Sequence, residues 1–163
     1  ARRDVGAGSA PPDRSDCAGG CVVAVPFPLG KALDRGALFG VNRFTGKGAW
    51  RVAATGNGFG PHAPAVLNGD HAYVASEDCY VYDVSTFTGQ LLWKANAGGS
   101  LDGVAYCGGS VWIMSGQLER RSATDGSLTG VFQPGSRLTS NLSTDGARVY
   151  VTGYNGVYAV ACQ

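Results

Sequence analysis

The sequence has almost no net charge and no long hydrophobic run. Its 163 residues include 13 Lys or Arg and 12 Asp or Glu, so the net charge is +1. A nearly neutral chain lacks the basic surface with which proteins hold nucleic acid or an anionic membrane. No stretch approaches the roughly 20 apolar residues of a membrane-spanning helix. We therefore expect neither a nucleic-acid partner nor a membrane span.

Strong helix formers are also scarce. The chain has only two Glu, three Lys and one Met, but 26 Gly and seven Tyr, with many Val and Thr. Glu, Lys and Met favour helices, whereas Val, Tyr and Thr favour strands and Gly favours turns. The composition predicts an all-β protein with no helix longer than about two turns.

The first residues differ from the rest of the chain. Residues 1–16 show no apolar period and hold Pro, Gly, Arg and Asp, which predicts a flexible tail or linker. The chain begins at Ala1 rather than Met, as expected of a processed chain or of a piece of a longer one, and a leader could precede it.

From Cys17 onward the sequence repeats itself. Three segments each begin with a turn glycine and continue as an apolar strand with an aromatic residue at one position. They are residues 69–76, 108–115 and 146–153, and residues 20–25 form a weaker copy. Their glycines are 39 and 38 residues apart. A second strand follows each copy, and Thr-Gly or Asp-Gly then leads into a further one, as in a tight hairpin. Strands are predicted at 71–76, 79–84, 111–115, 148–153 and 156–161.

The repeat is typical of a β-propeller. A unit of about 38–43 residues with four short antiparallel strands corresponds to one propeller blade. The alternative is a generic β-sandwich with coincidental hairpins, but three sets of motifs keep the same period. The units are about 17–60, 61–101, 102–139 and 140–163. These make about 3.5–4 blades, whereas propellers usually have 4–8, so we expect part of a larger ring. Another polypeptide, either the rest of a parent chain or a second copy, would complete it.

Three motifs resemble the PQQ-like (quinoprotein-type) β-propeller repeat: Tyr80–Asp83, Thr88–Trp93 and Thr45–Trp50. Its pattern runs roughly Leu-Tyr-Ala-x-Asp-x-x-Thr-Gly-x-x-x-Trp. The resemblance implies that Trp50 and Trp93 pack between neighbouring blades. It also places the hairpin turns at Gly46 and Gly89.

The third unit departs from this pattern, because Arg120 and Arg121 stand where small or apolar residues are usual. Strand alternation points one of them inward and the other outward. Two solvated arginines are one interpretation, and contact with an anion or a partner at the blade surface is the other.

The resemblance leaves function open, since the same repeat builds quinone-dependent alcohol dehydrogenases, an outer-membrane assembly scaffold and binding modules. The dehydrogenase site needs a catalytic Asp, a Ca²⁺ ion held by Glu and Asn, and two adjacent cysteines. No two cysteines are adjacent here, and we assign no residue to catalysis, to a cofactor or to a metal. We expect a non-catalytic binding or scaffolding module for protein or glycan partners. The alternative is a fragment of a PQQ- and Ca²⁺-dependent alcohol dehydrogenase whose site lies in other blades.

Five cysteines favour an oxidising compartment and thus an extracytoplasmic or secreted protein. Cys17 and Cys21 are close enough for a local disulfide. The other three, Cys79, Cys107 and Cys162, are expected to be small buried residues in strands.

Three further polar residues have weaker signals. Asn141 begins an Asn-Leu-Ser glycosylation sequon. His62 and His71 are each expected to be surface-turn residues, because a general base needs a partner that one sequence does not reveal.

Overall fold

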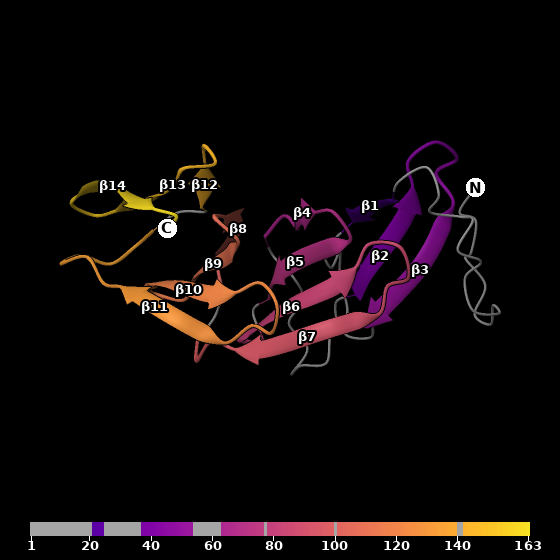
Figure 1. Cartoon of the computed structure of the whole chain (residues 1–163), viewed down its shortest axis with the longest axis horizontal. Helices are drawn as coiled ribbons and strands as arrows, with labels where there is room; N and C mark the ends of the chain where they lie inside the picture. Colours follow the sequence, from indigo (N-terminus) through magenta and orange to yellow (C-terminus); the bar gives the residue numbers. More distant parts are fainter. Residues whose placement is uncertain (1–20, 25–36, 54–62, 77, 100, 140–141) are drawn as a thin grey trace, which may run out of the picture.

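A computed structural model describes residues 21–24, 37–53, 63–76, 78–99, 101–139 and 142–163 (Figure 1). The regular structure in this part of the chain is 14 strands, and it contains no helix. The strands form four antiparallel sheets, each built from strands that follow one another in the sequence. The prediction of an all-β protein is confirmed.

Each sheet is here called a blade. Blade 1 holds β1 (Cys21–Ala24), β2 (Ala37–Asn42) and β3 (Gly48–Ala53). Blade 2 holds β4 (Val66–Asn68), β5 (His71–Ala75), β6 (Tyr80–Ser85) and β7 (Leu91–Asn96). Blade 3 holds β8 (Gly103–Cys107), β9 (Ser110–Met114), β10 (Leu118–Ser122) and β11 (Leu128–Phe132). Blade 4 holds β12 (Ser143–Thr144), β13 (Arg148–Gly153) and β14 (Gly156–Ala161).

The strand positions agree closely with the sequence prediction. Strands β13 and β14 have the predicted bounds, and β5, β6 and β9 differ by no more than one residue at each end. The agreement arises because turn glycines and alternating apolar residues mark short strands well.

The blades stand in a row that follows the sequence, with blades 1 and 4 at its two ends (Figure 1). The first strands of successive blades are neighbours, since β8 contacts both β4 and β12. Blades 2 and 3 have the four-stranded meander of a propeller blade. The described residues therefore form a partial β-propeller.

The apolar core lies between the blades. One cluster, which includes Leu38 and Val84, joins blades 1 and 2. A second, which includes Val81 and Ile113, joins blades 2 and 3, and a third joins blades 3 and 4. Because each blade packs on its neighbours in the row, the structure is stabilised by successive blade-to-blade contacts.

Two tryptophans make equivalent contacts with the following blade. Trp50 of blade 1 donates its indole N–H to the Thr86 carbonyl at 2.9 Å. Its ring lies over Gly89 and leaves no room for a side chain there, because a Cβ atom would stand 2.7 Å from the ring. Trp93 of blade 2 donates to the Ala123 carbonyl at 3.0 Å, and its ring covers Gly126 in the same manner.

A disulfide joins the last two blades. Cys107 at the end of β8 is bonded to Cys162, which follows β14, and both residues are buried. The expected burial of these two cysteines is confirmed, but the bond between them was not expected, because the fold brings together strand ends that are 55 residues apart. The predicted disulfide between Cys17 and Cys21 stays a prediction, because Cys17 and the side chain of Cys21 lie outside the described residues.

The Trp50 contact predicts different costs for the same substitution at two hairpin glycines. Gly46 and Gly89 both have positive φ, at 67° and 71°, but a Cβ atom at Gly46 meets nothing within 4 Å. Gly46→Ala should therefore cost about 1 kcal/mol from backbone strain alone. Gly89→Ala should cost about 1–3 kcal/mol more, because it displaces the indole. Urea denaturation measures both values, and equal losses would contradict the contact.

Removal of the disulfide should weaken the protein substantially. It closes a loop of 55 residues, for which the loss of unfolded-state entropy corresponds to about 4 kcal/mol. We expect the double variant Cys107→Ala/Cys162→Ala to lose about that free energy of unfolding in denaturant titration. An unchanged value would show that the bond does not form.

Candidate functional site

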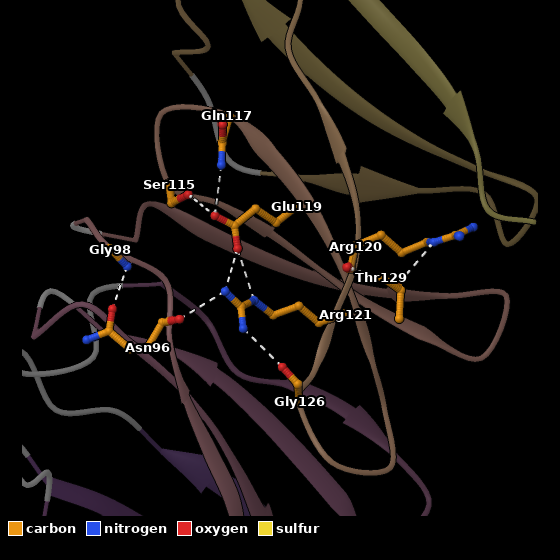
Figure 2. A network of polar contacts seen from close by, with 9 residues as sticks. All are labelled: Asn96, Gly98, Ser115, Gln117, Glu119, Arg120, Arg121, Gly126 and Thr129. Carbon is orange, nitrogen blue, oxygen red and sulfur yellow. Dashed lines mark hydrogen bonds and ion pairs between the residues drawn. The ribbon is translucent and has the colours of Figure 1, made fainter.

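A buried ion pair lies between blades 2 and 3 (Figure 2). Glu119 and Arg121 are alternate residues of β10, so both side chains extend from the face that meets blade 2. The carboxylate oxygen Oε2 accepts hydrogen bonds from Arg121 Nη2 at 2.6 Å and from Nε at 3.0 Å. Only 6% of Arg121 is exposed. At this burial the pair is stable only if its other polar atoms also find partners.

The surrounding groups supply these partners. Arg121 donates from Nη1 to the Gly126 carbonyl at 3.0 Å and from Nη2 to the Asn96 carbonyl at 2.9 Å. Glu119 Oε1 accepts from Ser115 Oγ at 2.8 Å and from Gln117 Nε2 at 3.2 Å. Since Asn96 belongs to β7 of blade 2, the network orients one blade against the next. Its charges are therefore used within the protein.

The neighbouring Arg120 points the other way (Figure 2). Its Nε donates to Thr129 Oγ1 at 3.3 Å on an exposed part of blade 3. The predicted alternation of the two arginines is thus observed. Neither a solvated position nor a surface contact fits Arg121, because its guanidinium is buried, whereas a partner contact through Arg120 stays a prediction.

Sequence reasoning missed the partner of Arg121. Glu119 stands two residues earlier in the same predicted strand, and residues two apart share a face. The opposite charges of Glu119 and Arg121 at this spacing, in a chain with only two glutamates, could therefore have predicted the ion pair.

A second charged pair joins His71 and Asp83 in blade 2. His71 Nδ1 lies 2.8 Å from Asp83 Oδ2, with the imidazole 39% exposed and the carboxylate fully buried. Burial raises the pKa of Asp83, while the hydrogen bond and the charge of His71 act in the opposite direction. The other carboxylate oxygen has no hydrogen-bond partner within the described part of the chain. His71 is therefore an oriented side chain at the start of β5, rather than the surface-turn residue expected.

An aromatic stack continues from His71 of blade 2 to blade 3. The Tyr73 ring is stacked on His71 with centroids 5.8 Å apart and on Tyr106 of blade 3 at 5.6 Å. Burial is the main cause that raises the pKa of Tyr73 to about 12. The phenol is thus neutral at physiological pH and contributes to packing.

Blade 4 presents an uncovered face. Strands β2, β6, β10 and β14 carry an apolar residue at one equivalent position. Pairing with the preceding strand aligns Val81, Leu118 and Val157, and pairing with the following strand aligns Leu38 with Val81. These residues are 3% exposed at Leu38, 0% at Val81 and 0% at Leu118, but 70% at Val157. In the first three blades the next blade covers this position. Nothing within the described residues covers it in blade 4.

Other predicted features lie elsewhere. Asn141 and His62 fall outside the described residues. The described residues contain no group of three or more His, Cys, Asp or Glu side chains that could hold a metal ion, and none of their segments is a helix that could cross a membrane. A shallow, largely polar depression of about 410 Å³ is lined by Gly116 and by residues 133–137.

The buried ion pair should be sensitive to the loss of either charge. Arg121→Met or Glu119→Gln should each cost about 3–5 kcal/mol of unfolding free energy, because the remaining charge is left without its partner. The double variant Glu119→Leu/Arg121→Met should cost much less than the sum of the two. Arg120→Met is the matched control and should change stability by no more than about 0.5 kcal/mol. Equal effects of Arg120→Met and Arg121→Met in denaturant titrations would contradict the network.

Comparison with known proteins identifies similar folds. No protein-family model and no curated protein sequence matches the chain. The crystal structure of the computationally designed Ika4 protein is similar with a TM-score of 0.63 and 14% identity, covering 85% of this chain and 86% of Ika4. BamB from Moraxella catarrhalis is similar with a TM-score of 0.61 and 18% identity, covering 79% of this chain.

The two similarities differ in extent. The present chain covers only 40% of the BamB chain, whereas it covers most of Ika4. At these identities the likeness concerns the fold alone. Both structures are propellers, and the blades described above have the same arrangement: the chain has the fold of a partial β-propeller.

Proposed function

We propose that this chain is a non-catalytic β-propeller module that binds or scaffolds another polypeptide, and that this polypeptide packs on the uncovered face of blade 4. The observation that carries the proposal is Val157. An apolar side chain that is 70% exposed occupies a position that is buried in all three other blades. Burial of a valine contributes about 1.5–3 kcal/mol, so a covering surface would gain affinity from it.

The remainder of this face suits a protein partner. Alternation places Tyr150, Thr152 and Ala159 on the same side of blade 4 as Val157. Tyr150 and Thr152 are half-buried and Ala159 is exposed. An aromatic residue among small and aliphatic ones, with Arg148 at the margin, resembles the apolar centre and polar rim of protein interfaces.

The charged groups described above favour binding over catalysis. Glu119 and Arg121 are engaged in contacts between blades 2 and 3. His71 and Asp83 form a pair within blade 2. No observation favours the alternative of a quinone-dependent dehydrogenase fragment.

Two finer assignments belong to the proposal. Trp50 and Trp93 each cover a hairpin glycine of the next blade. This contact needs both the glycine and the tryptophan of the Thr-Gly-x-x-x-Trp motif, so it supports membership of the PQQ-like repeat family. The buried Cys107–Cys162 disulfide supports an extracytoplasmic location, since such bonds persist in oxidising compartments.

Assembly in solution tests the proposed function. The chain has a mass of 16.7 kDa, and we expect light scattering to show either a larger assembly or strong binding of an apolar-surface dye. Val157→Lys should abolish both without loss of secondary structure, because a charge would be placed on the covering surface. Leu128→Lys is the matched control, since Leu128 is also exposed but lies on the outer strand β11. A wild-type monomer that binds no dye would contradict the proposal.

A further inference from the structure

The hairpin between β2 and β3 exposes an aromatic residue among basic ones. Phe44 is 70% exposed, and Arg43 and Lys47 of the same turn are exposed as well. The guanidinium carbon of Arg43 lies 4.6 Å from the centroid of the Phe44 ring, which is within the range of a cation–π contact. Arg43, Phe44 and Lys47 are here called the blade 1 patch. Blade 1 and blade 4 lie at opposite ends of the row (Figure 1).

Hydrogen bonds fix the backbone beneath the patch. The Asn42 side-chain oxygen Oδ1 accepts from the backbone N–H of Phe44 at 3.0 Å and from that of Thr45 at 2.9 Å. The backbone N–H of Asn42 donates to the Lys47 carbonyl at 2.9 Å, and the Gly46 N–H donates to the Asn42 carbonyl at 2.8 Å. A surface that is ordered before it binds loses less conformational entropy on binding. The turn is therefore suited to present its side chains to a partner.

The equivalent hairpins of blades 2 and 3 show that the turn itself does not require these side chains. Both hairpins are closed by the same two backbone hydrogen bonds as the blade 1 hairpin. The residues that correspond to Arg43, Phe44 and Lys47 are Thr86, Phe87 and Gln90 in blade 2, and Ala123, Thr124 and Ser127 in blade 3. Only the blade 1 member of this set combines an exposed ring with two positive charges.

The positive charge of blade 1 has no counterpart in its own blade. The described residues of blade 1 include Arg43, Lys47 and Arg51 but no Asp or Glu. Arg51 lies over the Phe39 ring, with its guanidinium carbon 5.8 Å from the centroid. Neither Arg43 nor Lys47 has a carboxylate partner within the described part of the chain. An unbalanced patch of one sign attracts a partner of the opposite sign.

The chain as a whole holds no acidic segment that would match the patch. Residues 1–20 contain three Arg and three Asp, residues 25–36 contain two basic residues and one Asp, and residues 54–62 contain no Asp or Glu. The longest acidic run in the entire sequence is the pair Glu77-Asp78. An acidic segment of several residues therefore belongs to another polypeptide.

The chemistry of the three side chains indicates what such a segment contains. A guanidinium presents a planar set of N–H donors that fits a carboxylate, and a lysine ammonium attracts a second one. Clusters of basic residues recognise acidic peptide motifs in this manner. Phe44 adds an apolar surface beside the two charges, and aromatic residues and Arg are enriched at the centres of protein interfaces.

We propose that the blade 1 patch is a docking site for an acidic segment of a partner polypeptide, in which carboxylates flank an apolar side chain. Arg43 and Lys47 pair with the carboxylates, and Phe44 contacts the apolar side chain. The proposal goes beyond the uncovered face of blade 4, because it concerns a different surface with a different chemistry. The two surfaces are expected to bind independently.

A fluorescent dodecapeptide of repeated Glu-Leu-Asp units tests this proposal. Added to the whole chain, it should bind saturably in an anisotropy titration at low salt. Raising the salt from about 50 mM to about 300 mM should weaken binding at least fivefold, because ions screen exposed charges. The corresponding peptide of Gln-Leu-Asn units should bind at least tenfold more weakly.

Substitutions taken from the other hairpins supply matched variants. Arg43→Thr/Lys47→Gln gives blade 1 the residues of the blade 2 turn, and it should weaken binding of the acidic peptide at least tenfold. Phe44→Thr, which copies blade 3, should weaken it at least fivefold. Phe87→Thr is the control, because Phe87 is 48% exposed at the equivalent position of a turn without basic residues. It should leave binding unchanged, and circular dichroism checks that all variants keep the fold.

Several results would overturn the proposal. These are no saturable binding of the acidic peptide, equal binding of the amide peptide, unchanged binding by Arg43→Thr/Lys47→Gln, or an equal loss in Phe87→Thr. Self-assembly that Arg43→Thr/Lys47→Gln abolishes would assign the patch to a second copy. Tighter binding of a DNA duplex than of the peptide would assign it to nucleic acid. Either result would overturn the proposal too.

The variant Val157→Lys separates this proposal from the proposed function, since it should bind the acidic peptide as well as the wild type does. If the peptide fails to bind but Val157→Lys still disrupts assembly, the blade 1 proposal fails alone. If the peptide binds but assembly and dye binding are absent, the proposed function fails alone.

Discussion

The fold depends on the contact of one indole ring with the backbone of the following blade. Trp50 lies over Gly89 and donates its N–H to the carbonyl of Thr86, and Trp93 repeats this with blade 3. A side chain in place of the glycine would occupy the space of the ring. The requirement links a turn residue to an aromatic residue of the preceding repeat. It explains why Thr-Gly and Trp recur together in a chain whose other residues vary.

The same principle explains the charges and the disulfide. Blade 3 lacks the tryptophan after its hairpin, so its junction with blade 4 has no such indole contact, whereas its junction with blade 2 keeps the contact of Trp93. Arg121 reaches the Asn96 carbonyl of blade 2, while Cys107 is bonded to Cys162 beside blade 4. A buried ion pair thus adds to the Trp93 contact between blades 2 and 3, and a covalent bond joins blades 3 and 4, where the repeat has no tryptophan. Blade 4 has no such partner on its outer side among the described residues.

The sequence was sufficient for the strands and the blade type, because both depend on local signals: turn glycines, alternation and a period. Long-range pairs were less accessible. Nothing local connects Cys107 to Cys162, and the pairing of His71 with Asp83 depends on the register of two strands. The motif match also aligned Asp83, wrongly, with the Asp of the repeat pattern. The polar side chain that accepts a hydrogen bond within the blade 2 hairpin is Ser85, not Asp83, which is turned to His71.

The central claim is that another polypeptide packs on the uncovered face of blade 4, and cross-linking from that face tests it most directly. A photoreactive amino acid is placed at position 157 and, as a control, at the solvent-facing position 128. The account predicts an intermolecular cross-link from position 157 and none from position 128. Cross-linking from neither position, in a protein that remains folded, would contradict it.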